Sequence, residues 1–184
     1  ILEKYGAPTP EALCESGLYH ASLLEKYDFS DIVISIKAST VPAMIAANRL
    51  LAARCPYPLH LGVTEAGSDD EGRIKSAVGI GTLLHDGIGD TIRVSLSEAP
   101  EAEIPVARKL VDYIESHRTS YSPPALGGVP NGRGGSNTQL KTEFSKRKSI
   151  SIDKVGGDNP VVVITDTKIN STLKPDYTAD EILA

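Results

Sequence analysis

Residues 58–96, PLHLGVTEAGSDDEGRIKSAVGIGTLLHDGIGDTIRVSL, decide the fold. This stretch begins and ends with short apolar runs, at 58–67 and 90–96, and a helical pattern at 72–87 separates them. Continuous apolar runs of this length are typical of strands in a parallel sheet. The order of strand, helix and strand therefore predicts repeated βα architecture of the α/β class.

The same pattern extends in both directions along the chain. An earlier apolar run, DIVISIK at 31–37, is preceded by a helical pattern at about 9–27 and followed by another at 41–54. An amphipathic helix is also expected at 101–118. A closed (β/α)8 barrel needs about 250 residues. Three strands therefore predict a small open sheet or part of a larger barrel, and the start at Ile1 favours the C-terminal part of a barrel.

A change in composition after residue 118 predicts a domain boundary. Residues 119–140 are rich in glycine and proline and are expected to form a linker. Residues 141–184 are then predicted to begin a second α/β domain, separate from the partial barrel of residues 1–118.

Three features are expected inside that later segment. Short strands are predicted for KSISI at 148–152 and for VVVIT at 161–165. The basic cluster KRK at 146–148 is expected on a solvated edge, where charge runs usually lie.

The composition excludes several classes of protein. Nineteen basic residues against 24 acidic ones give a net charge of −5, which argues against general binding of nucleic acid. The two cysteines, Cys14 and Cys55, are too few for a disulfide scaffold or a four-cysteine metal site. No apolar run reaches the ~18 residues of a membrane-spanning helix.

The alternation of residues along the expected strands separates a polar face from an aliphatic one. Because residues two apart in a strand share a face, Arg93 lies with Ser95, and Lys37 ends the polar face of its own strand. Glu65 also lies at a C-terminal strand end, where βα folds place their sites. His60 shares the polar face of its strand and is expected to be a hydrogen-bonded interior histidine rather than a metal ligand.

These side chains suit an anionic ligand. A lysine and an arginine beside a hydroxyl match the oxygens of a phosphate or diphosphate, and a buried polar lining is costly unless something satisfies it. The alternative is that the charges pair with carboxylates elsewhere in the fold.

Several longer strings make a family resemblance specific. They resemble the 4-hydroxy-3-methylbut-2-enyl diphosphate synthases, iron–sulfur enzymes of isoprenoid biosynthesis through methylerythritol phosphate. Residues 145–163, SKRKSISIDKVGGDNPVVV, are similar to the start of the extra domain in three-domain members of the family. The strings that carry the main resemblance are SIKAS (35–39), PLHLGVTEAG (58–67), GRIKSAVGIGTLL (72–84) and DGIGDTIRVSL (86–96).

The resemblance implies a TIM barrel that binds 2-C-methyl-D-erythritol 2,4-cyclodiphosphate and a separate domain that carries a [4Fe–4S] cluster. Neither Cys14 nor Cys55 lies in a cluster motif, so the cluster ligands are expected outside this chain, which alone should be inactive. The resemblance also implies a ferredoxin- or flavodoxin-type electron donor, and it allows a homodimer. The expected location is the bacterial cytoplasm or, in a plant, the plastid stroma.

The resemblance assigns roles to the polar residues already named. Lys37, Arg93 and Ser95 become contacts of the substrate, and Glu65 becomes a residue close to the cluster and the reacting carbon. We hypothesise that Glu65 is a general acid that helps the hydroxyl to depart. The alternative is a carboxylate that orients Lys37 or Arg93.

Two other functions use the same residues. In a class I aldolase-like barrel, Lys37 would form a Schiff base with a carbonyl substrate. In a non-catalytic module, the polar face would bind phosphate and nothing more.

Overall fold

A parallel sheet organises the computed structural model, which describes residues 1–67, 69–118, 145–165 and 177–178. Its strands lie in chain order, β1-β2-β3-β4-β5, and every neighbouring pair is parallel. The α/β class expected from the sequence is therefore confirmed. The strands are β1 (Ile34–Ser35), β2 (Leu59–Leu61), β3 (Thr91–Ile92), β4 (Val162–Thr165) and β5 (Tyr177–Thr178).

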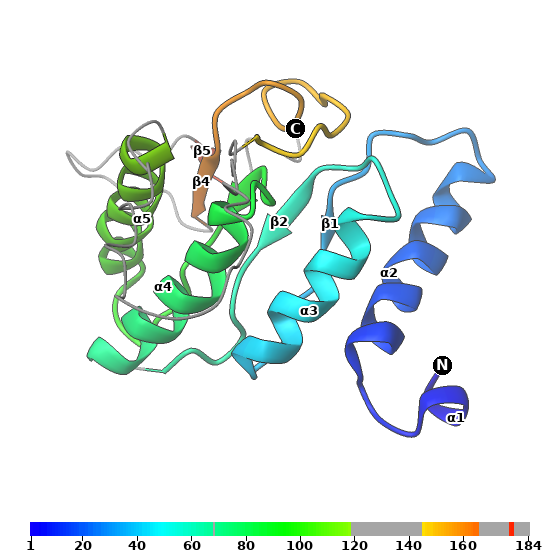
Figure 1. Cartoon of the computed structure of the whole chain (residues 1–184), viewed down its shortest axis with the longest axis horizontal. Coiled ribbons are helices and arrows are strands. Elements are labelled where there is room, and N and C mark those ends of the chain that lie inside the picture. Colours follow the sequence, from blue (N-terminus) through cyan, green and yellow to red (C-terminus); the bar gives the residue numbers. More distant parts are fainter. Residues whose placement is uncertain (68, 119–144, 166–176, 179–184) are drawn as a thin grey trace, which may run out of the picture.

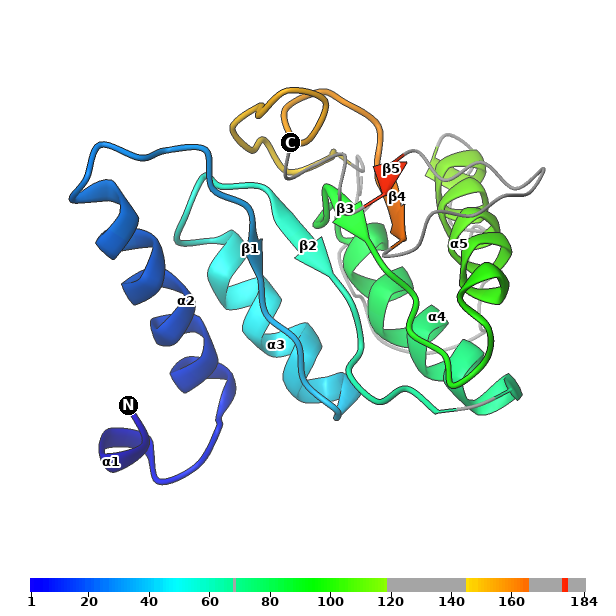
Figure 2. The ribbon, with the colours of Figure 1, turned by 180° about the vertical axis from the view of Figure 1, so that it is seen from behind.

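Helices cover one face of this sheet. Figure 1 shows the long helices in front of the strands, and Figure 2, from behind, shows the strands in front of the helices. The two faces therefore have different environments, one packed against helices and one without a helical cover in the described part of the chain. The helices are α1 (Leu2–Tyr5), α2 (Pro10–Glu25), α3 (Val41–Ala52), α4 (Asp69–His85), the 3-10 turn η1 (Pro100–Ala102) and α5 (Glu103–Arg118).

Local sequence signals fix where these helices begin and end. The Thr9 hydroxyl accepts a hydrogen bond from the Ala12 amide at 3.2 Å and caps α2, and Pro10 occupies its first turn. After α4 the chain turns at Gly87 with φ +78°, and a side chain there would collide with the backbone of Ser145. The absence of a side chain at Gly87 thus leaves room for the later segment to pack against this turn.

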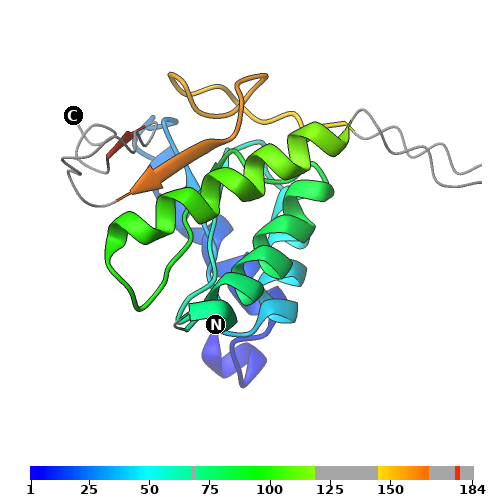
Figure 3. The same cartoon turned by 90° about the vertical axis from the view of Figure 1, so that its left-hand side faces the viewer.

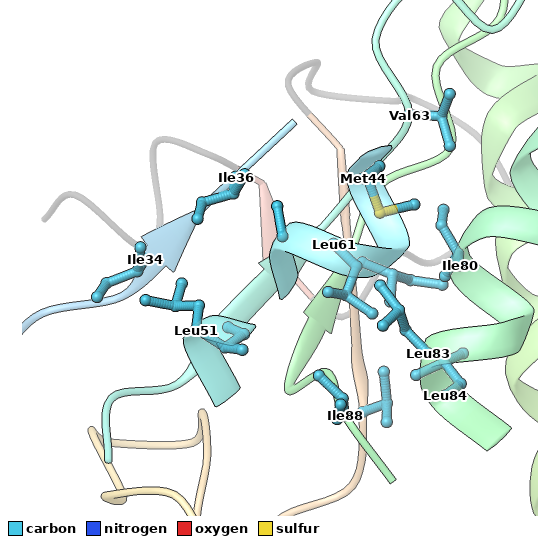
Figure 4. Packing of buried hydrophobic residues seen from close by; sticks show 14 of the residues in the cluster. Ile34, Ile36, Met44, Leu51, Leu61, Val63, Ile80, Leu83, Leu84 and Ile88 are labelled. Atoms are coloured by element: carbon cyan, nitrogen blue, oxygen red, sulfur yellow. The ribbon is translucent and has the colours of Figure 1, made fainter. Parts of the chain in front are cut away.

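The hydrophobic core lies between the helix-covered face of the sheet and α3 and α4 (Figure 4). Leu59, Leu61 and Ile92 from the strands are fully buried, as are Met44 and Leu51 from α3. Burial of each such side chain contributes about 1.5–3 kcal/mol relative to exposure. This packing fixes the aliphatic residues of each strand inward against the helices, so their neighbours in the chain must face the other side.

Within residues 145–165, strand β4 belongs to the same sheet, which differs from the separate domain expected for residues 141–184. The Val162 amide donates to the Asp90 carbonyl at 3.0 Å, and Ile92 lies beside Val163 in register. Val163 also joins the core with an exposure of 1%. An aliphatic strand that can extend a parallel sheet buries more apolar surface there than as the start of a new core. Residues 119–144, which include the expected linker, lie outside the described part.

The expected strand at 148–152 is absent from the described structure. Those residues run as irregular chain, with one isolated bridge between Ile152 and Val155. Figure 3 shows residues 145–161, drawn from yellow to orange, across the end of the sheet that lies far from α1. This is the end at which the strands begin.

The basic cluster KRK is mostly buried, so its expected place on a solvated edge is wrong for two of its three residues. Lys146 and Arg147 have side chains only 17% and 12% exposed. Arg147 donates to the carbonyls of Ala52 at 3.0 Å and Tyr57 at 3.1 Å, and also to that of Cys55. One guanidinium thus satisfies carbonyls at the end of α3 and in the segment after it, where a helix leaves its last carbonyls without partners of its own.

Asp90 is the carboxylate around which this cluster assembles, and its side chain is 2% exposed. Its two oxygens accept from the Leu59 amide at 2.9 Å and the Ser149 hydroxyl at 2.8 Å. The Lys146 ammonium lies 3.3 Å from one oxygen and Arg147 lies 3.9 Å from the other. We call Asp90, Lys146, Arg147 and Ser149 the Asp90 cluster.

Candidate functional site

The register of the strands arranges the second face of the sheet in layers. Ser35, His60, Thr91 and Val162 lie side by side on β1, β2, β3 and β4. Residues two further along share this face, which places Lys37, Gly62 and Arg93 in the next layer, towards the C-terminal ends of the strands. The sequence-predicted side chains of Lys37 and Arg93 therefore share one face, and they come from β1 and β3, on either side of β2.

Lys37 lies across the end of β2 because position 62 has no side chain. A Cβ built on Gly62 would lie 3.1 Å from Cε and 3.5 Å from Nζ of Lys37, and 3.3 Å from the carbonyl oxygen of Arg93. Any larger residue would push the lysine stem away from β3. Gly62 thus brings the Lys37 ammonium close to the backbone of Arg93.

His60 lies in the layer below these two cations. Its Nδ1 is 2.8 Å from the Thr91 hydroxyl, so it is hydrogen-bonded inside the sheet, as expected. Burial, and then the positive charges of Lys37 and Arg93, lower its pKa from 6.5 to about 4. The imidazole is therefore neutral at neutral pH. Among the described residues, no group of three or more His, Cys, Asp and Glu side chains is placed to hold a metal ion.

Arg93 has a carboxylate partner that the sequence did not indicate. Its Nε is 3.5 Å from Oε2 of Glu103, the first residue of α5, whose side chain is 7% exposed. The other oxygen of Glu103 accepts from the Leu96 amide at 3.0 Å. Arg93 therefore faces a carboxylate, as the alternative interpretation expects of a strand-end charge, and that carboxylate belongs to Glu103.

Ser95 and Glu65 lie beyond the strand ends. Ser95 is half-buried in the segment that follows β3. It lies two residues after Arg93, which is the spacing of side chains that share a face of a strand. Glu65 is exposed in the turn after β2, and its φ of +53° is in the left-handed region, which is rare for residues other than glycine and asparagine. Backbone strain of this kind costs about 1 kcal/mol or more and is concentrated at functional positions.

Two contacts hold the turn of Glu65 and the start of α4 to the loop after β3. The Ser97 amide donates to the Gly67 carbonyl at 3.2 Å. Arg73, in the first turns of α4, binds the Glu98 carboxylate through both terminal nitrogens at 2.6 and 2.8 Å. Fork-shaped pairs of this kind fix orientation as well as distance. The two loops therefore form one connected rim at the C-terminal ends of β2 and β3.

The described residues do not fit an iron–sulfur cluster. Cys14 is fully buried in α2, on the helix-covered side. Cys55 follows α3 beside Arg147, and burial raises the pKa of its thiol, which disfavours the thiolate that iron binds. Neither cysteine belongs to the layer of Lys37 and Arg93, so these two thiols do not form a cluster site beside that layer.

Comparison with known proteins places this sheet in a family. A family model described as the GcpE TIM-barrel domain matches residues 1–108, which is more than half of the chain. The chain belongs to the GcpE family. The resemblance inferred from the sequence motifs is thus confirmed, and the four residues Lys37, Glu65, Arg93 and Ser95 all lie within the match.

Curated members of the GcpE family are similar over much of the chain. Proteins named 4-hydroxy-3-methylbut-2-en-1-yl diphosphate synthase (flavodoxin) match it at 46% identity in Bacteroides thetaiotaomicron, 49% in Fusobacterium nucleatum and 58% in Ruminiclostridium cellulolyticum. The alignments cover 96%, 81% and 62% of this chain. The chain spans only 29%, 43% and 33% of the lengths of these relatives.

Within the described residues of this GcpE chain, no helix has the length and apolar character needed to cross a membrane.

Proposed function

We propose that this chain forms part of the substrate-binding barrel of a 4-hydroxy-3-methylbut-2-en-1-yl diphosphate synthase. The observation that carries the proposal is the layer that holds Lys37 and Arg93 beside a neutral histidine, at the strand ends of a GcpE sheet. The ligand of this layer is the diphosphate of 2-C-methyl-D-erythritol 2,4-cyclodiphosphate. The relatives are named as diphosphate synthases, which supports the same substrate class.

The chemistry of the layer supports binding of a diphosphate. An ammonium is a compact charge, whereas a guanidinium offers paired N–H donors in one plane, and together they match bridging and terminal phosphate oxygens. Ser95, two residues after Arg93, adds a hydroxyl donor. Because His60 is neutral, it does not add a third positive charge that would repel the two cations in the absence of ligand.

Glu65 is the proton donor in this proposal. Reductive opening of the cyclic diphosphate consumes a pair of electrons, and the hydroxyl leaves as water once it has gained a proton. Glu65 stands on the rim beyond the layer of Lys37 and Arg93, in a turn tied to the loop after β3. In this proposal, the ligands of the [4Fe–4S] cluster lie outside this chain. The surface that binds the ferredoxin- or flavodoxin-type electron donor also lies outside it.

The order of strands supports a place in the C-terminal part of a (β/α)8 barrel. β1 to β4 follow one another in chain order and in parallel, with α3, α4 and α5 as crossovers, as consecutive strands of such a barrel do. We propose that the barrel extends to residue 165 and that the insert domain of the three-domain enzymes begins after it. The alignment lengths give the Bacteroides relative nearly twice the length of the Ruminiclostridium one, and the longer relative aligns to almost all of this chain.

Titration calorimetry on the full-length protein tests the proposed site. We expect Lys37→Ala and Arg93→Ala each to weaken binding of the cyclic diphosphate at least about tenfold, because each removes a charged hydrogen bond. Lys75→Ala is the matched control, since Lys75 pairs with Glu71 on the outer side of α4. Unchanged affinity in both site variants would contradict the proposal. Borohydride trapping of a carbonyl substrate on Lys37 would instead support an aldolase.

A further inference from the structure

Glu103 is buried at the start of α5 although it is an acid. Its side chain is 7% exposed, and a buried carboxylate is costly unless charges and hydrogen bonds satisfy it. The N-terminal end of a helix favours negative charge, and this stabilises Glu103 without any need for Arg93. The helix start therefore explains why an acid is tolerated at position 103. It does not explain why the carboxylate is directed towards Arg93.

The two carboxylate oxygens of Glu103 have different partners. Oε1 accepts from the Leu96 amide at 3.0 Å, which fixes the chain just beyond Arg93 and Ser95. Oε2 lies 3.5 Å from Nε of Arg93. A single buried group thus contacts both the backbone that follows β3 and the guanidinium that β3 carries.

We propose that Glu103 is a positioning residue that holds the Arg93 guanidinium in the orientation required by the diphosphate. This inference rests on the proposed function and adds a residue to its site. End-on contact with a phosphate uses the two terminal nitrogens of a guanidinium. A carboxylate at Nε is at the opposite edge, so it fixes the plane of the group without competing for that contact. Order imposed before binding lowers the entropy that the ligand must remove.

The neighbouring carboxylate Glu98 offers a matched comparison. It lies in the loop that precedes α5 and also binds an arginine, but its partner is Arg73 on α4 rather than a residue in the layer of Lys37 and Arg93. Glu98→Gln and Glu103→Gln make the same chemical change five residues apart. Glu103→Gln removes the carboxylate that faces Nε of Arg93, whereas Glu98→Gln removes a carboxylate partner of Arg73.

A double-mutant cycle on the full-length protein tests the inference, with calorimetric affinity for the cyclic diphosphate as the readout. Gln at 103 keeps an oxygen for the Leu96 amide but loses the charge that holds Arg93. We expect Glu103→Gln to weaken binding about five- to tenfold with little change in the unfolding midpoint, and Glu98→Gln to change it less than about twofold. In the Arg93→Ala background, Glu103→Gln should change affinity less than about twofold.

The outcomes separate the inference from the proposed function. Equal losses from Glu103→Gln in the presence and absence of Arg93 would mean that Glu103 acts through the loop at Leu96, and the inference would be wrong. No loss at all would also overturn it. If Arg93→Ala alone leaves affinity unchanged, then the proposed site itself is wrong. Glu103→Asp replaces the amide variant in the same cycle if that variant does not fold, because its shorter carboxylate cannot maintain both contacts.

Discussion

The two ends of the same strands use similar charged residues for different purposes. At the N-terminal ends, Lys146 and Arg147 are enclosed with Asp90, and most of their hydrogen bonds go to backbone carbonyls of neighbouring segments. At the C-terminal ends, Lys37 and Arg93 stand in one layer above a neutral histidine. The first arrangement connects chain segments. The second concentrates positive charge where barrel enzymes bind substrate.

This difference predicts that changes at the two ends separate stability from activity. Removal of a group from the Asp90 cluster should alter unfolding and leave catalytic constants of the folded fraction unchanged. Removal of a group from the other end should alter binding or rate and leave unfolding nearly unchanged. Four substitutions, two of them with matched control variants, test this separation.

The largest effect is expected at Glu65. In the full-length enzyme, Glu65→Gln should lower turnover about a thousandfold, or about 4 kcal/mol, because the amide cannot donate the proton of a general acid. Affinity for the cyclic diphosphate, iron content and the unfolding midpoint should each stay near the parent values. A loss of affinity as large as the loss of rate would favour the alternative, in which Glu65 orients Lys37 or Arg93.

The next effect is expected at Asp90, on stability. Asp90→Ala removes the carboxylate that faces Lys146 and accepts from the buried Leu59 amide. We expect the free energy of unfolding in urea to fall by about 3 kcal/mol or more. Asp158→Ala, at an exposed acid in the same segment, is the control and should have little effect. Retention of full stability by Asp90→Ala would show that the cluster does not hold this end together.

His60, between the two ends, should make stability depend on pH. Its pKa is about 4 in the folded state and about 6.5 when unfolded, so the unfolded chain binds the extra proton between these values. Stability should therefore fall as pH drops from 7 to 5, by up to about 2 kcal/mol from this group. His60→Gln should lose this part of the dependence in urea titrations at the two pH values, whereas His20→Gln, at an exposed position, should keep it.

The smallest effect is expected at an ion pair on the outer surface. Arg49 and Asp86 approach to 2.7 Å, but their side chains are 52% and 29% exposed. Exposed pairs contribute little because water and salt screen them. Arg49→Ala should change the free energy of unfolding by about 0.5 kcal/mol or less. If Arg49→Ala lowered the free energy of unfolding as much as Asp90→Ala, burial would not explain why the Asp90 cluster stabilises the protein more than a surface ion pair does.

Short-range periodicity was enough to predict the layer of Lys37 and Arg93. Alternation along 31–37 and 90–96 determines which side chains share a face, and the strands are neighbours because the units repeat. Neither inference needs a contact between residues distant in the chain. The hydrogen-bonded interior position of His60 followed from the same alternation.

Glu103 and the Asp90 cluster could not be predicted in this way. Glu103 belongs to EAEIPVAR, where an acid near a helix start normally indicates a solvated first turn. Asp90 binds Ser149 across 59 residues of chain, and no local pattern records that pairing. One usable signal was the Asp90 carboxylate directly before an apolar strand, because an acid that enters a core requires partners.

The Asp90 cluster has a consequence for the order in which the protein folds. Arg147 binds Ala52, which is 95 residues away along the chain. Formation of this contact therefore costs the conformational entropy of closing a long loop. During synthesis, the carbonyls after α3 and the Asp90 carboxylate leave the ribosome before the residues that will bind them. Until then water must satisfy these groups, and the nascent sheet has an open, hydrated end that only the later segment can seal.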